Sequence, residues 1–547
     1  MSWEYLNMEP KTPKKQLKFG KEAKELILEG VDIISAAVSA TLGPRGHNVA
    51  IDRKWGAPQV VHDGVTVAKE VDLPNPFVNM GAQLTKEAAS RTNDAAGDGT
   101  TTATILVQSI AREAYKAISA GNNSMMIRRG IEKATAAVMD ELKKMAKEIK
   151  TPAETQYIAM VSAQDEEIGK MVAKTMERLG KDGVVTVDES KGASIEVDFK
   201  EGMEFDRGYI SPYFITKPAT QETILEEPYI LITDKRIAAL QTDFLPFLEM
   251  FMKNGANKTL LIIAEDVSGE SLATLVVNKL RGNIQVAAVK APGFGDRQKD
   301  VLEDIAILTG GTVISKDLNT KWENVTVDML GRCGRVNVVK DATLIVDGKG
   351  DKDKLKERIE SITAEKKKAT NEFDKEKLEE RLAKLTTGIA IINVGANSEA
   401  EMREKKERCI DAISATKAAL DEGIVPGGET ALIRASGVLR ELKGATDEET
   451  VGIRIVQKAC EAPFIILMDN SGFNAGRMLQ QLEGTKSPIG VDVIDGALKD
   501  LLKAGIIDPV KVTRSALQNA VSTAIMITTT NVLITDIIEP PNPTKGE

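Results

Sequence analysis

The feature that most constrains this 547-residue chain is a carboxylate bracketed by two glycines, directly before a helical pattern. Residues 93–102 read Asn-Asp-Ala-Ala-Gly-Asp-Gly-Thr-Thr-Thr. Gly97 and Gly99 let the backbone approach a ligand closely. The free N–H groups at a helix start form an anion site, and a carboxylate beside a phosphate needs a cation between them, so Asp98 indicates Mg²⁺. By itself the stretch fits either a nucleotide-phosphate loop or a capped helix after a tight turn.

Length and composition predict a soluble protein of several domains. A chain of 547 residues exceeds one hydrophobic core, so about two to four domains are expected. The net charge of −9 argues against nucleic acid as a partner, because phosphate backbones attract basic surfaces. Apolar runs are too short to span a bilayer, and residues 1–20 lack a signal or transit pattern. The sequence therefore predicts a cytoplasmic protein with no membrane partner. Its widely spaced cysteines are expected to be reduced and buried: Cys333, Cys409 and Cys460.

Hydrophobic periodicity predicts helical chain ends and an alternating α/β middle. Ile27, Val31, Ile34 and Val38 recur on one helical face. Further helices are expected near 101–120, 125–147, 242–253, 269–281 and 400–421, and strands near 48–52, 59–61, 183–188, 194–197, 229–233, 259–264, 286–290, 389–394 and 525–537. The charged segment 351–387 predicts a pair of exposed helices. The Asp63-Gly64 turn either closes a hairpin or opens a helix.

Five segments resemble the group I chaperonins, the GroEL-type family. They are VSATLGPRGHN at 38–48, NMGAQLTKEAASRTNDAAGDGTTT at 79–102, EGMEFDRGYISPYF at 201–214, KAPGFGD at 290–296 and KVTRSALQ at 511–518. The similarity runs from about Lys18 to Ile538, with the motifs in the family's order. It implies an α+β multidomain chaperonin fold with three parts. These are a mostly helical equatorial ATPase domain at 1–144 and 422–547, a small α/β hinge domain at 145–200 and 390–421, and an α/β apical domain at 201–389.

The resemblance implies an ATPase site with ATP and Mg²⁺ as cofactors and K⁺ as a compatible further ion. Asp63 and Asp411 match catalytic carboxylates, and Asp98 matches the Mg²⁺ ligand. Phosphoryl transfer needs positioning and charge neutralisation more than covalent chemistry, so three aspartates suit it. The residues implied to bind nucleotide are Thr41, Leu42, Gly43, Pro44, His62, Asp98, Gly99, Thr100, Thr101, Thr102, Gly428, Asp492 and Asp508.

The resemblance also implies partners: unfolded client proteins, a co-chaperonin lid and copies of the chain itself, in a seven-membered ring that stacks on a second ring. Hydrolysis would time capture, enclosure and release of clients. By spacing alone, apolar residues of the middle segment are ordinary core. Only the resemblance places a set of them on a client-binding surface: Tyr209, Tyr213, Phe214, Leu245, Leu248, Leu272, Val276 and Val277.

The sequence departs from the family pattern at several places. His62 stands where lysine is usual, Glu429 where a third glycine is common, and Asp492-Val493-Ile494 where Asn-Ala-Ala is usual. Differences at 470–477 leave a single ring as an alternative, and the tail lacks Gly-Met repeats. A scaffold protein that keeps the fold without ATP cycling is therefore a competing hypothesis. A metabolite kinase is a third, against which the missing GxxxxGK[ST] pattern argues.

Overall fold

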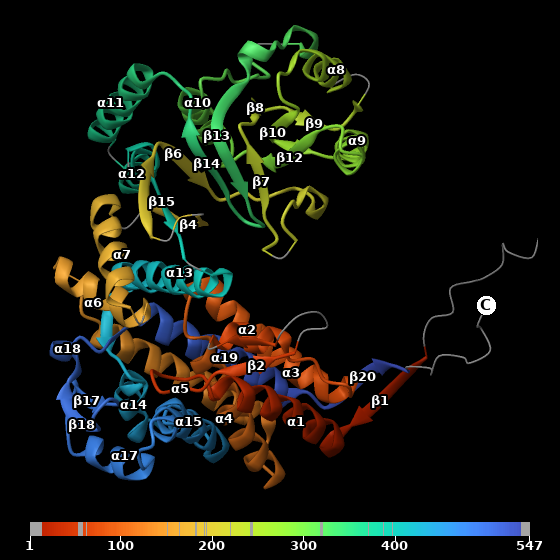
Figure 1. Ribbon diagram of the computed structural model, residues 1–547. Coiled ribbons are helices and arrows are strands. Elements are labelled where there is room, and N and C mark those ends of the chain that lie inside the picture. The colour runs from red at the N-terminus through yellow and green to blue at the C-terminus, as the bar shows by residue number, and fades with distance from the viewer. Residues whose placement is uncertain are drawn as a thin grey trace, which may run out of the picture. The chain divides into compact units, whose positions relative to one another are not determined.

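The chain folds into two compact units. Their helices and strands are labelled in Figure 1. The computed structural model describes residues 14–52, 58–61, 63–149, 151–163, 165–180, 183–190, 192, 194–218, 220–240, 244–317, 321–369, 371–386, 388–396 and 398–537. Unit 1 comprises Met1–Lys174 and Glu407–Glu547, and unit 2 comprises Thr175–Lys406. Both ends of the chain thus contribute to unit 1. The boundaries of the units fall inside the two predicted hinge segments, and the three-part division stays a prediction.

Unit 1 is mostly helical. Its helices are α1 (Gly20–Ser39), α2 (Gly64–Glu70), α3 (Pro76–Ala96), α4 (Thr100–Ser119), α5 (Ser124–Met145), α6 (Pro152–Ala163), α14 (Thr430–Ser436), η6 (Gly437–Arg440), α15 (Asp447–Ala459), α16 (Ala462–Asn470), α17 (Ala475–Glu483), α18 (Leu501–Ala504) and α19 (Val510–Thr529). Four strand pairs accompany them: β1 (Lys15–Phe19) with β20 (Val532–Asp536), β2 (Val49–Ile51) with β3 (Gln59–Val61), β16 (Ile424–Pro426) with β19 (Ile507–Pro509), and β17 (Ile489–Asp492) with β18 (Ala497–Asp500). Helices α7 (Glu166–Leu179) and α13 (Glu399–Glu422) each run across a boundary between the units.

Glycines set the closest helix crossings of unit 1. A Cβ on Gly30 of α1 would lie 1.9 Å from the Val78 carbonyl oxygen of α3. A Cβ on Gly452 of α15 would lie 2.3 Å from the Ile127 carbonyl oxygen of α5. The backbones can meet this closely only because no side chain stands between them. The helices then bury Ile, Leu, Val and Ala side chains in one continuous core.

Unit 2 is built on a seven-stranded mixed sheet in the order β12-β10-β8-β13-β14-β6, with β7 also paired to β13. Its strands are β6 (Gly202–Phe205), β7 (Thr223–Glu226), β8 (Tyr229–Ile232), β10 (Thr259–Ala264), β12 (Gln285–Lys290), β13 (Gly331–Val338) and β14 (Thr343–Gly348). Smaller sheets join β4 (Val184–Glu189), β15 (Ile389–Val394) and β5 (Glu196–Lys200), and β9 (Arg236–Ile237) with β11 (Asp266–Val267). The helices are η2 (Pro212–Phe214), α8 (Leu245–Asn254), α9 (Gly269–Leu280), α10 (Asp296–Thr309), η4 (Trp322–Asn324), η5 (Val327–Met329), α11 (Lys352–Lys368) and α12 (Glu372–Thr386).

The predicted elements agree with the structure except near the C-terminus. The continuous apolar runs are the parallel central strands β8, β10 and β12, buried as expected. The charged segment forms α11 and α12. The strand expected at 525–537 is wrong in extent, because α19 continues to Thr529 and only β20 is extended. Within the described ranges the three cysteines are free and buried, and no helix is long and apolar enough to cross a bilayer.

The α5–α15 crossing makes a matched pair of glycine substitutions informative. Gly452→Ala would drive a methyl group into the α5 backbone, and we expect it to destabilise the protein by about 1–3 kcal/mol. Gly437→Ala is the control, because a Cβ there would meet no described atom within 4 Å and its φ is −55°. Denaturant unfolding measures both. Equal stability of the two variants would contradict the close crossing.

Candidate functional site

The glycine-bracketed carboxylate lies at the junction of two long helices. Gly97 ends α3 in the left-handed conformation, with φ of 70°, and Gly99 is the N-cap of α4, with φ of 84°. The N–H of Gly99 donates to Asp98 Oδ1 over 2.5 Å. As far as the described residues go, no side chain caps α4, so the N–H groups of its first turn remain for a ligand. The helix opening predicted from the sequence is present, with an uncapped N-terminus suited to an anion.

Asp63 begins a second helix against this junction. It is the N-cap of α2, and its carboxylate accepts from the N–H groups of Val65 and Thr66 over 3.0 and 2.8 Å. A Cβ on Gly64 would lie 2.3 Å from the Thr101 hydroxyl oxygen, so the start of α2 touches the first turn of α4. The Asp63-Gly64 turn thus opens a helix. His62, predicted beside it, lies outside the described residues.

Helix α13 brings Asp411 to the same place. A Cβ on Gly97 would lie 2.1 Å from the Ser414 Cβ, so this helix packs directly on the glycine junction. Asp411 lies three residues before Ser414, about one turn away on the same helix face. The negative charges of Asp98 and Asp63 act on its carboxyl and help to raise its pKa. Residues separated by more than 300 positions therefore meet at one site.

The strand pair β16–β19 supplies the fourth side of the site. Val425 pairs with Asp508 in antiparallel register, and the turn after β16 carries Gly428 and Glu429, both with φ of 59°. The N–H of Glu429 donates to the Asp508 carboxylate. The Thr102 hydroxyl donates to Glu429 Oε1 over 2.5 Å, which joins this turn to α4. Glu429 is a site residue that the sequence prediction did not include, although its place after two glycines was a signal.

The segment Thr41–Pro44 lies beside a hydrophobic wall. A Cβ on Gly43 would meet Leu467 Cδ1 at 2.2 Å, and one on Gly428 would meet Leu467 Cδ2 at 4.0 Å. Leu467 thus lies next to both predicted nucleotide segments. Asp492 is nearly buried, and its carboxylate accepts from Lys499 Nζ over 2.6 Å and from the Ile494 N–H over 2.9 Å. Its carboxylate is therefore already paired within the β17–β18 hairpin.

Burial and mutual repulsion govern the acidic groups of the site. We call Asp63, Asp98, Asp411, Glu429 and Asp508 the carboxylate cluster. Burial, with added repulsion from Asp98 and Asp63, raises the pKa of Asp411 to about 8. Burial and the neighbouring Glu429 raise the pKa of Asp508 to about 8. Solvent reaches Asp98, yet the surrounding protein still raises its pKa by desolvation, against the hydrogen bond from Gly99. The buried members therefore keep their protons to a higher pH than free carboxyls do, and a cation bound among them would favour their ionised form.

The donor set suits a hard cation that shares its ligands with a nucleotide. Carboxylate oxygens are Mg²⁺ ligands, and Mg²⁺ is usually held by one or two of them together with phosphates and water. Across the described ranges, no three His, Cys, Asp or Glu side chains are arranged to hold a metal by themselves. Asp98 at the open α4 N-terminus therefore fits Mg²⁺ bound together with a phosphate better than a cage made by protein alone.

The predicted client surface is divided between exposed and buried residues of unit 2. Tyr213 is 65% exposed and Val277 of α9 is 43% exposed, while Tyr209, Leu245, Leu272 and Val276 are partly buried. Phe214 is fully buried and Leu248 nearly so, contrary to the prediction, because both pack into the core of unit 2. Leu280, at the end of α9, is 67% exposed and was not among the predicted residues. Lys279 donates to the carbonyls of Tyr213 and Ile215 over 2.7 and 2.8 Å and so ties α9 to η2.

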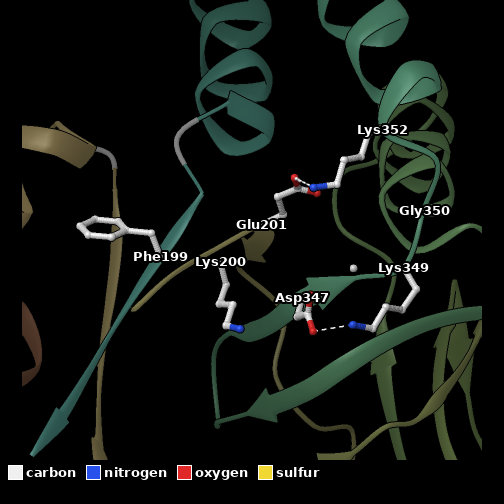
Figure 2. Close-up of a pocket in the computed structure, with 8 residues that line it drawn as sticks. Phe199, Lys200, Glu201, Asp347, Lys349, Gly350 and Lys352 are labelled. Carbon is white, nitrogen blue, oxygen red and sulfur yellow. Dashed lines mark hydrogen bonds and ion pairs between the residues drawn. The ribbon is translucent and has the colours of Figure 1, made fainter. Parts of the chain in front are cut away.

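An open hollow of about 430 Å³ lies in unit 2 (Figure 2). It is lined by Phe199, Lys200, Glu201, Asp347, Gly348, Lys349, Gly350 and Lys352. Lys349 pairs with Asp347 over 2.5 Å and Lys352 with Glu201 over 2.9 Å, so most of its charges neutralise each other. The predicted nucleotide residues belong to unit 1, so this hollow is not the predicted nucleotide site.

Comparison with known proteins identifies the family of this chain. A model of the TCP-1/cpn60 chaperonin family matches residues 34–537. The chain belongs to this family. Among solved structures, it is similar to the chaperonin gp146 from the bacteriophage EL 2 (Pseudomonas aeruginosa), crystallised in the presence of ATP-BeFx. The TM-score is 0.72 at 21% sequence identity, covering 95% of this chain and 99% of the phage chain.

The predicted chaperonin fold is thus confirmed. The narrower resemblance to the group I branch stays a prediction, as does a cytoplasmic location. Because the phage chaperonin is only 21% identical, its similarity supports the fold alone. The roles of individual residues have to be argued from the geometry of the site.

The raised pKa of Asp411 predicts how stability varies with pH. Since the folded chain holds a proton that the unfolded chain releases above about pH 4, this group's contribution to stability falls as the pH rises from about 4 to about 8. Asp411→Asn cannot release that proton. Its melting temperature in EDTA should exceed that of wild type by a margin that grows from pH 5 to pH 8, reaching about 3 °C.

Asp94→Asn removes an exposed carboxylate of α3 and serves as the control for this pH series. It should follow the wild-type profile. A constant difference between Asp411→Asn and wild type across the pH range would contradict the burial and repulsion assigned to Asp411.

Proposed function

We propose that this chain is an ATP-dependent chaperonin: it captures non-native proteins on exposed apolar residues of unit 2 and drives their folding by a cycle of ATP hydrolysis. One observation carries the ATPase part. Carboxylates from five separate chain segments meet around the uncapped N-terminus of α4. Such an arrangement binds phosphate at the helix N–H groups while carboxylates stand ready for a cation and for water.

Within this proposal, each residue has a distinct task. The first-turn N–H groups of α4 and the hydroxyls of Thr100 and Thr101 bind and orient the phosphates, while the Thr102 hydroxyl already donates to Glu429. Asp98 would hold Mg²⁺, which supplies charge neutralisation on the phosphate oxygens. Asp411 orients the attacking water and accepts its proton, for which a carboxylate with a raised pKa is suited. Asp63, fixed by the α2 N-terminus, orients water and phosphate from the other side. Gly428 and Asp508 contact the adenosine, and Leu42 belongs to the first nucleotide loop.

The client surface comprises Tyr213, Val277 and Leu280, with partly buried support from Leu272 and Val276. Exposed apolar side chains of this size bind other apolar surfaces without a sequence requirement. That property suits capture of unfolded chains. The same residues would later release the client and bind a co-chaperonin lid, as the resemblance to group I chaperonins implies.

Assembly with further copies of the chain is part of the proposal. The β1–β20 ribbon is only two-stranded and exposes Leu17, Phe19, Ile534 and Val532. An isolated two-stranded ribbon is marginally stable, and an exposed apolar edge invites pairing with another chain. These features support contact between copies, and the family resemblance supports a seven-membered ring stacked on a second ring.

Asp411→Ala tests the hydrolytic role. We expect ATP hydrolysis to fall by about a hundredfold, because the water loses its base, while ADP binding persists. Asp421→Ala, on the same helix and in an exposed pair with Lys511, should keep wild-type turnover. Steady-state phosphate release and calorimetric ADP binding measure the two properties. Undiminished turnover in Asp411→Ala would refute the mechanism, and a wild-type protein without turnover would favour the scaffold hypothesis.

Substitutions on α9 test the client surface. Val277→Glu and Leu280→Glu should each weaken suppression of client aggregation by about fivefold. The reason is that burying a charged carboxylate against an apolar client costs free energy. ATP turnover should stay unchanged. Phe373→Glu is the control, since Phe373 is an exposed apolar residue of α12 in the same unit. Light scattering from a diluted, denatured client reports capture, and loss of capture in all three variants equally would remove α9 from this role.

A further inference from the structure

Glu429 is an acidic residue that no part of the proposed hydrolysis uses. It follows two glycines and adopts φ of 59°, a left-handed conformation that is costly for a residue with a side chain. Glycine would fill this position without strain. A strained residue persists where the surrounding structure requires it, and such residues concentrate at functional sites.

The side chain of Glu429 reaches the predicted phosphate loop. Glu429 Oε1 accepts from the Thr102 hydroxyl over 2.5 Å, within the first turn of α4. Its N–H donates to Asp508, and its carboxyl senses the charge of Asp98. The carboxylate therefore lies one hydroxyl away from the helix N-terminus proposed to bind phosphate.

A carboxylate at this position opposes an anionic ligand. A free nucleotide would bring its full phosphate charge beside Glu429, Asp98 and Asp508. The Mg²⁺ complex carries less negative charge and also offsets the charge of the carboxylates. Burial and the nearby Asp98 raise the pKa of Glu429 to about 7, so the group is ionised above neutral pH.

We propose that Glu429 makes the site select the magnesium complex of a nucleotide and reject the free nucleotide by charge repulsion. This inference rests on the proposed function and deepens it, because it assigns the charge state of the ligand that the site admits. The hydrogen bond to Thr102 holds the carboxylate in the position from which it acts.

The test is calorimetric binding of ADP at pH 8 to the full chain, once in MgCl₂ and once in EDTA. Glu429→Gln keeps the size of the side chain and the acceptor for Thr102 but removes the charge. We expect it to bind free ADP about tenfold more tightly than wild type, the order expected for one unit of repulsion in a partly buried site. Affinity for the magnesium complex should stay within about twofold.

Two further variants make the result specific. Glu429→Gly removes the charge and the backbone strain together, and it should show the same gain in affinity for free ADP over wild type. Glu441→Gln neutralises an exposed carboxylate elsewhere in unit 1 and should behave as wild type.

Other outcomes overturn the inference in distinguishable ways. Equal changes in MgCl₂ and EDTA would make Glu429 a structural residue that merely holds Thr102. Weaker binding of the magnesium complex by Glu429→Gln would mean that Glu429 helps to hold the cation. Unchanged affinity of Glu429→Gln for free ADP would show that the charge of Glu429 does not act on the bound nucleotide. A wild-type chain that binds ADP in neither solution would refute the proposed function, and the inference with it.

Discussion

Burial of several carboxylates at one helix N-terminus, with their mutual repulsion added, is the constraint on which unit 1 depends. Asp98, Asp411 and Asp508 all have raised pKa values, and burial is the largest cause in each case. Folding therefore costs free energy at this site, and the helix core supplies the compensation. The glycine crossings of α1 with α3 and of α5 with α15 allow that core to pack closely enough. A cation bound with an anionic ligand would offset the cost of ionising these buried carboxylates, which links ligand binding to stability.

Local sequence patterns predicted most of the secondary structure. The Gly97–Thr102 stretch predicted a helix opening, and the continuous apolar runs predicted the buried parallel strands of unit 2. The end of α19 was mispredicted because β-branched residues at 527–530 favour strands, while packing against α3 and α4 keeps 527–529 helical. Tertiary contacts decide such cases, and they cannot be read from a short window. That both chain ends form one unit came from the family resemblance alone.

The glycine-bracketed turn of the candidate site was predictable from the sequence, and the other segments of the site were less so. Asp98 and its flanking glycines carry a physical signature in sequence, whereas Asp411 and Asp508 join the site only through long-range contacts. Phe214 and Leu248 show that a residue's role cannot always be carried over from a family resemblance, since both are core residues here. Glu429 shows the opposite: a departure from the pattern lies at the centre of the site, bonded to Thr102. Departures next to predicted ligand loops are therefore worth as much attention as matches.

The most direct test of this account is a cryo-electron microscopy structure of the chain with ADP and Mg²⁺. The account predicts density for the phosphates at the first turn of α4, with the cation beside Asp98 and with Asp411 on the side of the β-phosphate where the γ-phosphate of ATP would lie. Phosphate density elsewhere, for example among Lys200, Lys349 and Lys352 in the hollow of unit 2, would contradict it. In that event the carboxylate cluster would have to be explained without a nucleotide.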